Sequence, residues 1–293
     1  MLDKNVSLIS DKIKLDGSFY TPDCGENSDK PVVIVCSGFT GMKEIHPARF
    51  ARFLTKQDYT VFGFDYRGFG KSDGLVNKVL IEEQIRDISN VVSYVKSAYP
   101  NRKLVLAGWG MSGGMILESA KSVGKLIDGL IPLNGFFDSI RVQKALRGED
   151  GFDDYKDWLA RQRVKNVNGE GAKDFDPFDF YPLDNVTKGY VFTELVKTDG
   201  YGIRSDFDFA DSLMDFNCEL DLSHLSNTPI LIAHGGENAL HPVEEPKSLY
   251  EKYPNEDKEL FLLEGGGHTE WMLDDDPKFI KFATKLSSWL ERF

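Results

Sequence analysis

Short apolar runs rich in β-branched residues alternate with amphipathic segments through the first half of the chain. Such runs are typical of strands buried on both faces of a parallel sheet. We predict strands of this kind at residues 31–37, 60–65, 103–107 and 126–133. Residues 79–98 place apolar side chains at helical spacing and end before Pro100, which cannot continue a helix. This alternation predicts parallel strands joined by right-handed helical crossovers.

The alternation stops at about residue 139 and does not resume until about residue 226. Within this segment there is no strand-like apolar run, and acidic and aromatic residues are interleaved, as in residues 174–181. Further strands and helices are predicted after it, at residues 229–233, 242–253, 259–263 and 277–293. The pattern therefore predicts a core domain made of residues 1–138 and 227–293, with residues 139–226 inserted as a mostly helical lid.

The composition limits the partners that we expect for this chain. With 35 Lys and Arg residues against 47 Asp and Glu residues, its net charge of −12 disfavours binding to nucleic acid or to anionic membrane surfaces. Three widely spaced cysteines without a C-x-x-C pair predict neither a disulfide framework nor a zinc site. No secretory signal and no apolar run near the roughly 20 residues of a membrane span is present. We expect a cytoplasmic protein with a small-molecule substrate and no cofactor, and the sequence is compatible with a homo-oligomer.

Residues 108–114 (GWGMSGG) directly follow the third predicted strand. They resemble the nucleophile elbow of the α/β-hydrolase superfamily, G-x-S-x-G, in which a strand turns sharply into a helix. Counting from the end of the strand at Gly108 places Gly110 at the apex, where the family carries its nucleophile. A frame shifted by two residues would instead make Ser112 the nucleophile. We prefer the Gly110 frame, in which Ser112 is a packing residue of the first helical turn.

Two further segments extend the resemblance over most of the chain outside the insertion. Residues 36–41 (CSGFTG) are similar to the family's H-G-F segment, and residues 65–72 (DYRGFGKS) match its structural D-x-R-G-x-G-x-S loop. The resemblance implies a mostly parallel sheet of about eight strands flanked by helices, the α/β-hydrolase fold with a helical lid. It also implies an oxyanion hole formed by the backbone N–H groups of Phe39 and Met111, with Trp109 beside them at the substrate-binding site.

Residues 265–268 (GGGH) resemble the loop that carries the family's catalytic histidine, which implies that His268 is a general base. The family pattern H-G-x-x-D-x-x-x-P, read from His234, places the acid of the triad at Asn238. An asparagine can orient an imidazole but cannot stabilise an imidazolium by charge. Asp138, which follows the fourth strand, is our preferred substitute, and it fits equally well as the N-cap of the first insertion helix.

The motifs together imply an enzyme that acts on a small to medium, partly apolar ester, acyl or carbonyl compound, by hydrolysis or C–C cleavage. Gly110 offers no side-chain nucleophile, so the expected mechanism is direct, with His268 as general base and a backbone oxyanion hole. Lyase or cyclase chemistry is an extension of the same site. The alternatives are a serine hydrolase inactivated at position 110 and a non-catalytic ligand-binding member of the fold. Some aromatic residues of the insertion are expected to line the substrate pocket, and the larger share to pack the lid onto the sheet.

Overall fold

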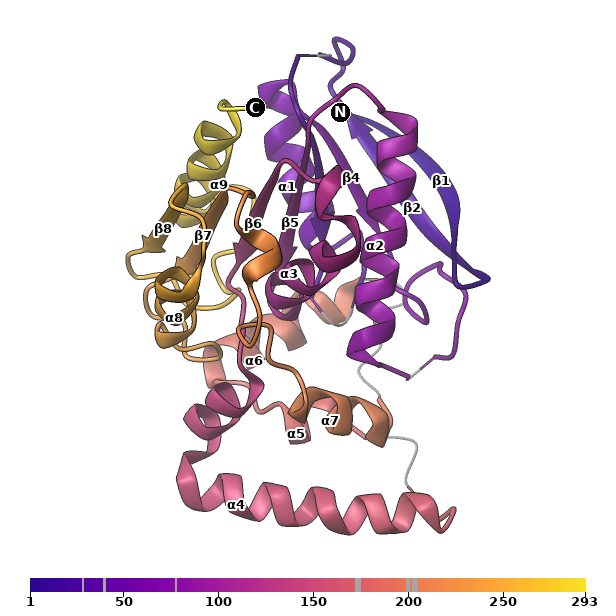
Figure 1. The fold of residues 1–293 in the computed structure, drawn as a ribbon, viewed down its shortest axis with the longest axis vertical. Helices are drawn as coiled ribbons and strands as arrows, with labels where there is room; N and C mark the ends of the chain where they lie inside the picture. The colour runs from indigo at the N-terminus through magenta and orange to yellow at the C-terminus, as the bar shows by residue number, and fades with distance from the viewer. Residues whose placement is uncertain (28, 39–40, 77, 172–174, 199–200, 202–204) are drawn as a thin grey trace.

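A computed structural model describes residues 1–293 except residues 28, 39–40, 77, 172–174, 199–200 and 202–204. An eight-stranded sheet of order β1-β2-β4-β3-β5-β6-β7-β8 forms its centre (Figure 1). The strands are β1 (Leu2–Ser10), β2 (Ile13–Thr21), β3 (Val32–Cys36), β4 (Thr60–Phe64), β5 (Leu104–Trp109), β6 (Gly129–Leu133), β7 (Ile230–Gly235) and β8 (Lys258–Leu263). β2 pairs antiparallel with β1 and β4, and all other neighbours pair in parallel. The predicted mostly parallel sheet of about eight strands is confirmed.

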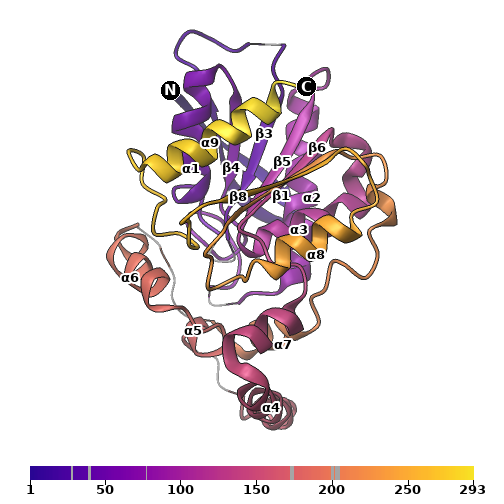
Figure 2. The same cartoon turned by 90° about the vertical axis from the view of Figure 1, so that its left-hand side faces the viewer.

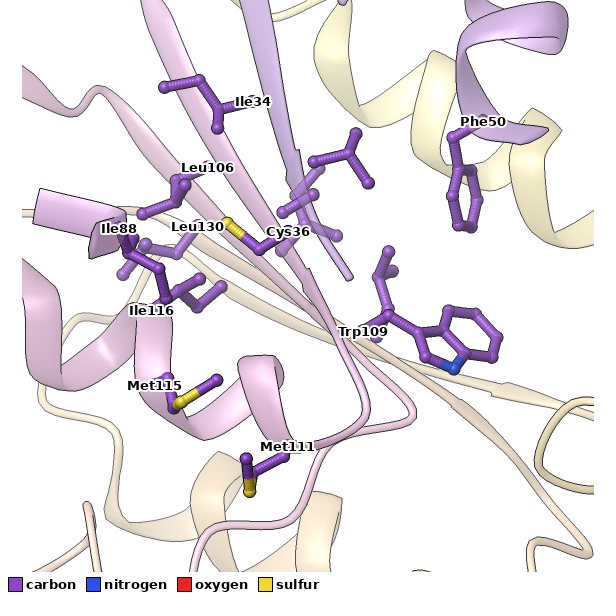
Figure 3. Packing of buried hydrophobic residues seen from close by; sticks show 14 of the residues in the cluster. Ile34, Cys36, Phe50, Ile88, Leu106, Trp109, Met111, Met115, Ile116 and Leu130 are labelled. Atoms are coloured by element: carbon purple, nitrogen blue, oxygen red, sulfur yellow. The ribbon is translucent and has the colours of Figure 1, made fainter. Parts of the chain in front are cut away.

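Helices cover both faces of this sheet (Figure 2). On one face lie α1 (His46–Leu54) and α9 (Pro277–Leu290), and on the other lie α2 (Ile81–Ala98), α3 (Met111–Val123) and α8 (Glu244–Lys252). Every residue of β3, β4, β5 and β6 is buried, as the continuous apolar runs of these strands require. Figure 3 shows this packing at the end of β5, where Trp109 lies on the same side of the strands as Phe50 of α1, and Met115 of α3 lies on the other.

The segment between β6 and β7 contains helices and, among its described residues, no strand. Its helices are α4 (Ser139–Val167), α5 (Pro177–Phe180), α6 (Asn185–Thr193) and α7 (Phe207–Met214), with short 3-10 turns at Leu195–Lys197 and Ser223–Leu225. They lie beyond the carboxyl ends of the parallel strands (Figure 1), the edge where open α/β sheets bind ligands. The division of the chain into a core and a lid at residues 138 and 227 stays a prediction.

A buried charge network holds the base of this insertion on the core. The carboxylate of Glu245, in α8, accepts hydrogen bonds from the backbone N–H groups of Phe137 (2.6 Å) and Asp138 (3.2 Å). The guanidinium of Arg141, in the first turn of α4, pairs with both Glu245 and Glu219.

Within the part of the chain that the structure describes, no helix is long and apolar enough to cross a lipid bilayer.

Candidate active site

Gly110 alone forms the turn between β5 and α3. Its φ of 59° and ψ of −126° lie in a region that L-residues with a side chain rarely adopt. The turn is held by two backbone bonds of 2.9 Å, from Gly110 N to Leu133 O and from Gly113 N to Gly110 O. The apex of the strand-to-helix turn is therefore Gly110, as the preferred frame predicts.

Ser112, the competing nucleophile candidate, faces away from this apex. Its side chain is completely buried, and its Oγ lies 2.8 Å from the hydroxyl of Tyr66 and donates to the carbonyl oxygen of Ser37. A hydroxyl held between two buried oxygens is fully used in packing the turn. The structure thus places Ser112 where the sequence analysis expected a packing residue.

His268 reaches the apex from the loop after β8. A Cβ atom built on Gly110 would lie 3.8 Å from Nε2 of His268, so a side-chain nucleophile at position 110 would meet this nitrogen. Asn134, at the end of β6, donates from Nδ2 to the carbonyl oxygen of His268 (2.5 Å) and holds the loop in place. Burial lowers the pKa of His268 well below its usual value, and the neighbouring His241 and His234 lower it further. The two predicted elements, apex and imidazole, meet in space.

Asn238 occupies the place of the acid. Its Nδ2 lies 3.1 Å from Nδ1 of His268, while its Oδ1 accepts from the backbone N–H groups of Leu240 (3.1 Å) and His241 (2.9 Å). A carboxylate at this position would accept a hydrogen bond from Nδ1. A general base at Nε2 of His268 requires a hydrogen-bond acceptor facing Nδ1. The NH₂ group of Asn238 is instead a hydrogen-bond donor at that position.

Asp138, the preferred substitute for the acid, does not contact the imidazole. Its carboxylate accepts from the backbone N–H of Arg141 (3.2 Å) and caps the N-terminus of α4. The choice of Asp138 as the triad acid is therefore wrong, and the N-cap alternative is correct. An aspartate directly before a helix satisfies a backbone donor that the helix itself leaves free, which is sufficient reason for its presence there.

The predicted oxyanion and substrate residues are described in part. Met111 is the first residue of α3, so its N–H has no acceptor within the helix and lies at the positive end of the helix dipole. Phe39 lies outside the described residues. Trp109 lines the cavity over the apex, and its indole stacks on the imidazole of His46 with 4.7 Å between ring centroids and 15° between planes.

Two histidines that sequence reasoning assigned no role also line this cavity. Nδ1 of His241 lies 2.5 Å from the carbonyl oxygen of Asn134, and its Nε2 is bonded to the hydroxyl of Tyr181, which comes from the insertion. Nε2 of His46 is buried without a hydrogen-bond partner among the described residues. Burial lowers the pKa of each imidazole to about 3, so both are neutral at pH 7. No spacing in the sequence signals them, because they follow different strands.

The cavity at the apex is small and mostly apolar, with a volume of about 70 Å³. Apolar walls with a few polar groups are typical of small-molecule sites, and this volume is below the roughly 300–1,000 Å³ of most ligand pockets. Its aromatic lining comprises Trp109, Phe136, Phe178, Tyr181, Tyr201 and Phe209. Of the other aromatic residues of the insertion, Tyr190, Phe207 and Phe216 are buried outside this lining. The side chain of Phe180 lies outside the described residues. Among the described residues, no group of three or more His, Cys, Asp or Glu side chains is arranged to hold a metal ion.

Known proteins resemble this chain over nearly its whole length. The family model described as serine aminopeptidase S33 (Hydrolase_4) matches residues 27–276. An uncharacterized 31.7 kDa protein from the traX-finO intergenic region of Escherichia coli is 26% identical over 273 residues, or 91% of this chain and 92% of that protein. The monoglyceride lipase of Saccharomyces cerevisiae is 22% identical over 293 residues, or 96% and 91%. The structure of DcsB in complex with its substrate analogue matches with a TM-score of 0.80 at 19% identity, covering 99% of each chain, which concerns the fold alone.

Proposed function

The chain belongs to the α/β-hydrolase superfamily, in the family described as serine aminopeptidase S33, and we propose that it acts on a small, largely apolar ester, acyl or carbonyl compound without an acyl-enzyme intermediate on residue 110. One observation carries this proposal. Gly110 occupies the apex in the conformation of a nucleophile elbow, and the place of the missing side chain lies 3.8 Å from Nε2 of His268. The reacting group of the substrate takes that place.

The cavity supports a carbonyl compound as the substrate class. Apolar and aromatic side chains form most of its wall, which favours an apolar body over a charged one. At the apex itself, the polar groups are those of His268 and of the N-terminus of α3 at Met111. Donors placed where negative charge develops on an oxygen stabilise the transition states of acyl and carbonyl chemistry.

The test is a turnover screen of short-chain esters, thioesters, lactones and 1,3-dicarbonyl compounds with three proteins. We expect the unsubstituted chain to turn over at least one class and His268→Ala to abolish that turnover. Ser112→Ala is the matched control, because this hydroxyl is used in packing the same turn, and we expect it to keep most of the activity. Full activity of the His268→Ala variant would refute the proposal. Tight binding of such compounds by all three proteins without turnover would favour a ligand-binding protein instead.

A further inference from the structure

The orientation of the Asn238 amide follows from two backbone donors. The N–H groups of Leu240 and His241 both point at the same atom of the side chain, at 3.1 Å and 2.9 Å. A backbone N–H can only donate, so that atom is the carbonyl oxygen Oδ1. The NH₂ group of Asn238 must then face Nδ1 of His268, 3.1 Å away.

His234 does not compete as the acceptor for this NH₂ group. Its Nε2 lies 3.2 Å from Nδ2 of Asn238 but only 2.8 Å from the carbonyl oxygen of His241. Because a carbonyl oxygen only accepts, Nε2 of His234 carries a hydrogen and donates it there. The amide hydrogen of Asn238 therefore has Nδ1 of His268 as its acceptor.

A neutral imidazole carries one hydrogen, and the nitrogen that accepts a hydrogen bond is the one without it. We propose that His268 holds its hydrogen on Nε2 and acts as a hydrogen-bond donor to the substrate, with Asn238 as the positioning residue that sets this tautomer. This inference rests on the proposed function, in which a carbonyl group docks over Gly110. It replaces the general base that the family resemblance implies. Burial, which keeps the pKa of His268 low, is consistent with a neutral ring.

The tautomer narrows the class of substrate. Nε2–H of His268 faces the apex, and in an elbow of this geometry the N–H of the next residue, Met111, faces the same place. Two N–H donors at the apex suit a carbonyl oxygen that carries negative charge, as in an enolate. A neutral imidazole stabilises such an oxygen while its hydrogen stays on the ring. The favoured substrates are 1,3-dicarbonyl compounds, which lose their acidic C–H proton to water and bind as the enolate, so the site needs no base of its own. They come ahead of esters, which need an activated water.

The tautomer is measured directly by ¹⁵N NMR of the full chain labelled at its five histidines. His268→Gln assigns the signals of residue 268 by their loss. We expect a protonated Nε2 and an unprotonated Nδ1 at pH 7, and in Asn238→Asp the hydrogen moves to Nδ1. Asp has the shape of Asn, and one of its oxygens still accepts from the backbone N–H groups of Leu240 and His241. The variant therefore keeps the packing and replaces the donor that faces Nδ1 of His268 with an acceptor. A protonated Nδ1 in the unsubstituted chain would overturn the inference, whatever the turnover screen shows.

The donor role is measured with 4-nitrophenol, whose phenolate oxygen mimics an enolate and whose ionisation is visible by absorbance. We expect the protein to bind it as the phenolate. His268→Ala and Asn238→Asp should weaken binding by about tenfold or more, the loss typical of a hydrogen bond to a charged group. His268→Gln keeps an N–H donor without the basicity of imidazole and should retain most of the affinity, as should the Ser112→Ala control.

Different results overturn the two proposals. Phenolate binding that His268→Ala leaves unchanged would overturn the donor role, and so would turnover that requires imidazole and is lost in His268→Gln while phenolate binding is kept. A protonated Nε2 without phenolate binding and without turnover of any carbonyl compound would overturn the proposed function and leave the tautomer standing.

Discussion

Replacing Gly110 with serine tests whether this site lacks only a nucleophile. The structure has room for the change, since the new Cβ would lie 3.8 Å from Nε2 of His268 and 4.0 Å from Cα of Gly38, which are ordinary contact distances. The cost is conformational, because φ at position 110 is 59°. A side chain held in such a region costs about 1–3 kcal/mol. For a domain of this size, each kcal/mol lowers the Tm by about 2–4 °C, a shift that differential scanning calorimetry resolves.

The chemical outcome depends on residue 238. In Gly110→Ser alone, the serine hydroxyl meets a protonated Nε2 that cannot take its proton, and we expect almost no labelling by a fluorophosphonate. In Gly110→Ser with Asn238→Asp, the carboxylate accepts from Nδ1 of His268 and leaves Nε2 as the base. The expected gain in labelling rate is about 10⁴-fold, the factor lost when the acid of a serine protease triad becomes an amide. Intact-mass spectrometry measures the rates, and peptide mapping assigns the label to residue 110.

The comparison carries its own controls. Asn238→Asp without the serine should remain unlabelled, which shows that Ser112 does not react. Equal labelling rates for Gly110→Ser and for the double variant would refute the reasoning about the tautomer. A double variant that gives a calorimetric unfolding transition and is never labelled would refute the expectation that serine at 110 and aspartate at 238 together restore a reactive nucleophile.

Two other predictions follow from the buried groups around the cavity. Burial lowers the pKa of His46 and of His241 to about 3, from 6.5 in the unfolded chain, so the unfolded chain binds more protons below pH 6.5. The free energy of unfolding therefore has its full value above pH 6.5 and falls by about 2 kcal/mol per histidine by pH 5. Urea unfolding at pH 7 and at pH 5 measures this fall. Equal free energies of unfolding at the two pH values would contradict the burial of these imidazoles. Tyr181→Phe removes the hydrogen bond to Nε2 of His241 and should lower the free energy of unfolding by about 1–3 kcal/mol. We expect limited proteolysis to cut the insertion faster in this variant than in the unsubstituted chain. An unchanged digestion rate would show that this bond does not hold the insertion to the rest of the chain.

Local patterns in the chain predict the core strands and the apex well. The buried strands β3 to β6 are near-continuous apolar runs, and the elbow is a contiguous motif. Both can therefore be predicted without knowing which distant residues lie near them in the fold. The apolar pattern does not predict the hairpin of β1 and β2. β1 lies at the edge of the sheet, most of its side chains are exposed, and charged residues interrupt its apolar alternation.

The partner of His268 could not be chosen from local patterns. Asp138 and Asn238 both follow buried strands of one parallel sheet, and carboxyl ends of such strands meet at one edge, so either could have reached the ring. Only the tertiary structure shows that the β7 loop brings Asn238 to Nδ1, while Asp138 turns to the N-terminus of α4.

The α/β architecture, the glycine at the apex and the histidine opposite it can therefore be predicted from the sequence, because a contiguous segment of the chain indicates each of them. The folded chain decided the direction of the hydrogen bond at Nδ1 of His268. That direction depends on two backbone N–H groups that hold the oxygen of Asn238, and on His234, which uses its own hydrogen elsewhere. Residue identities state which groups can donate or accept, and only their arrangement in space assigns each donor to an acceptor.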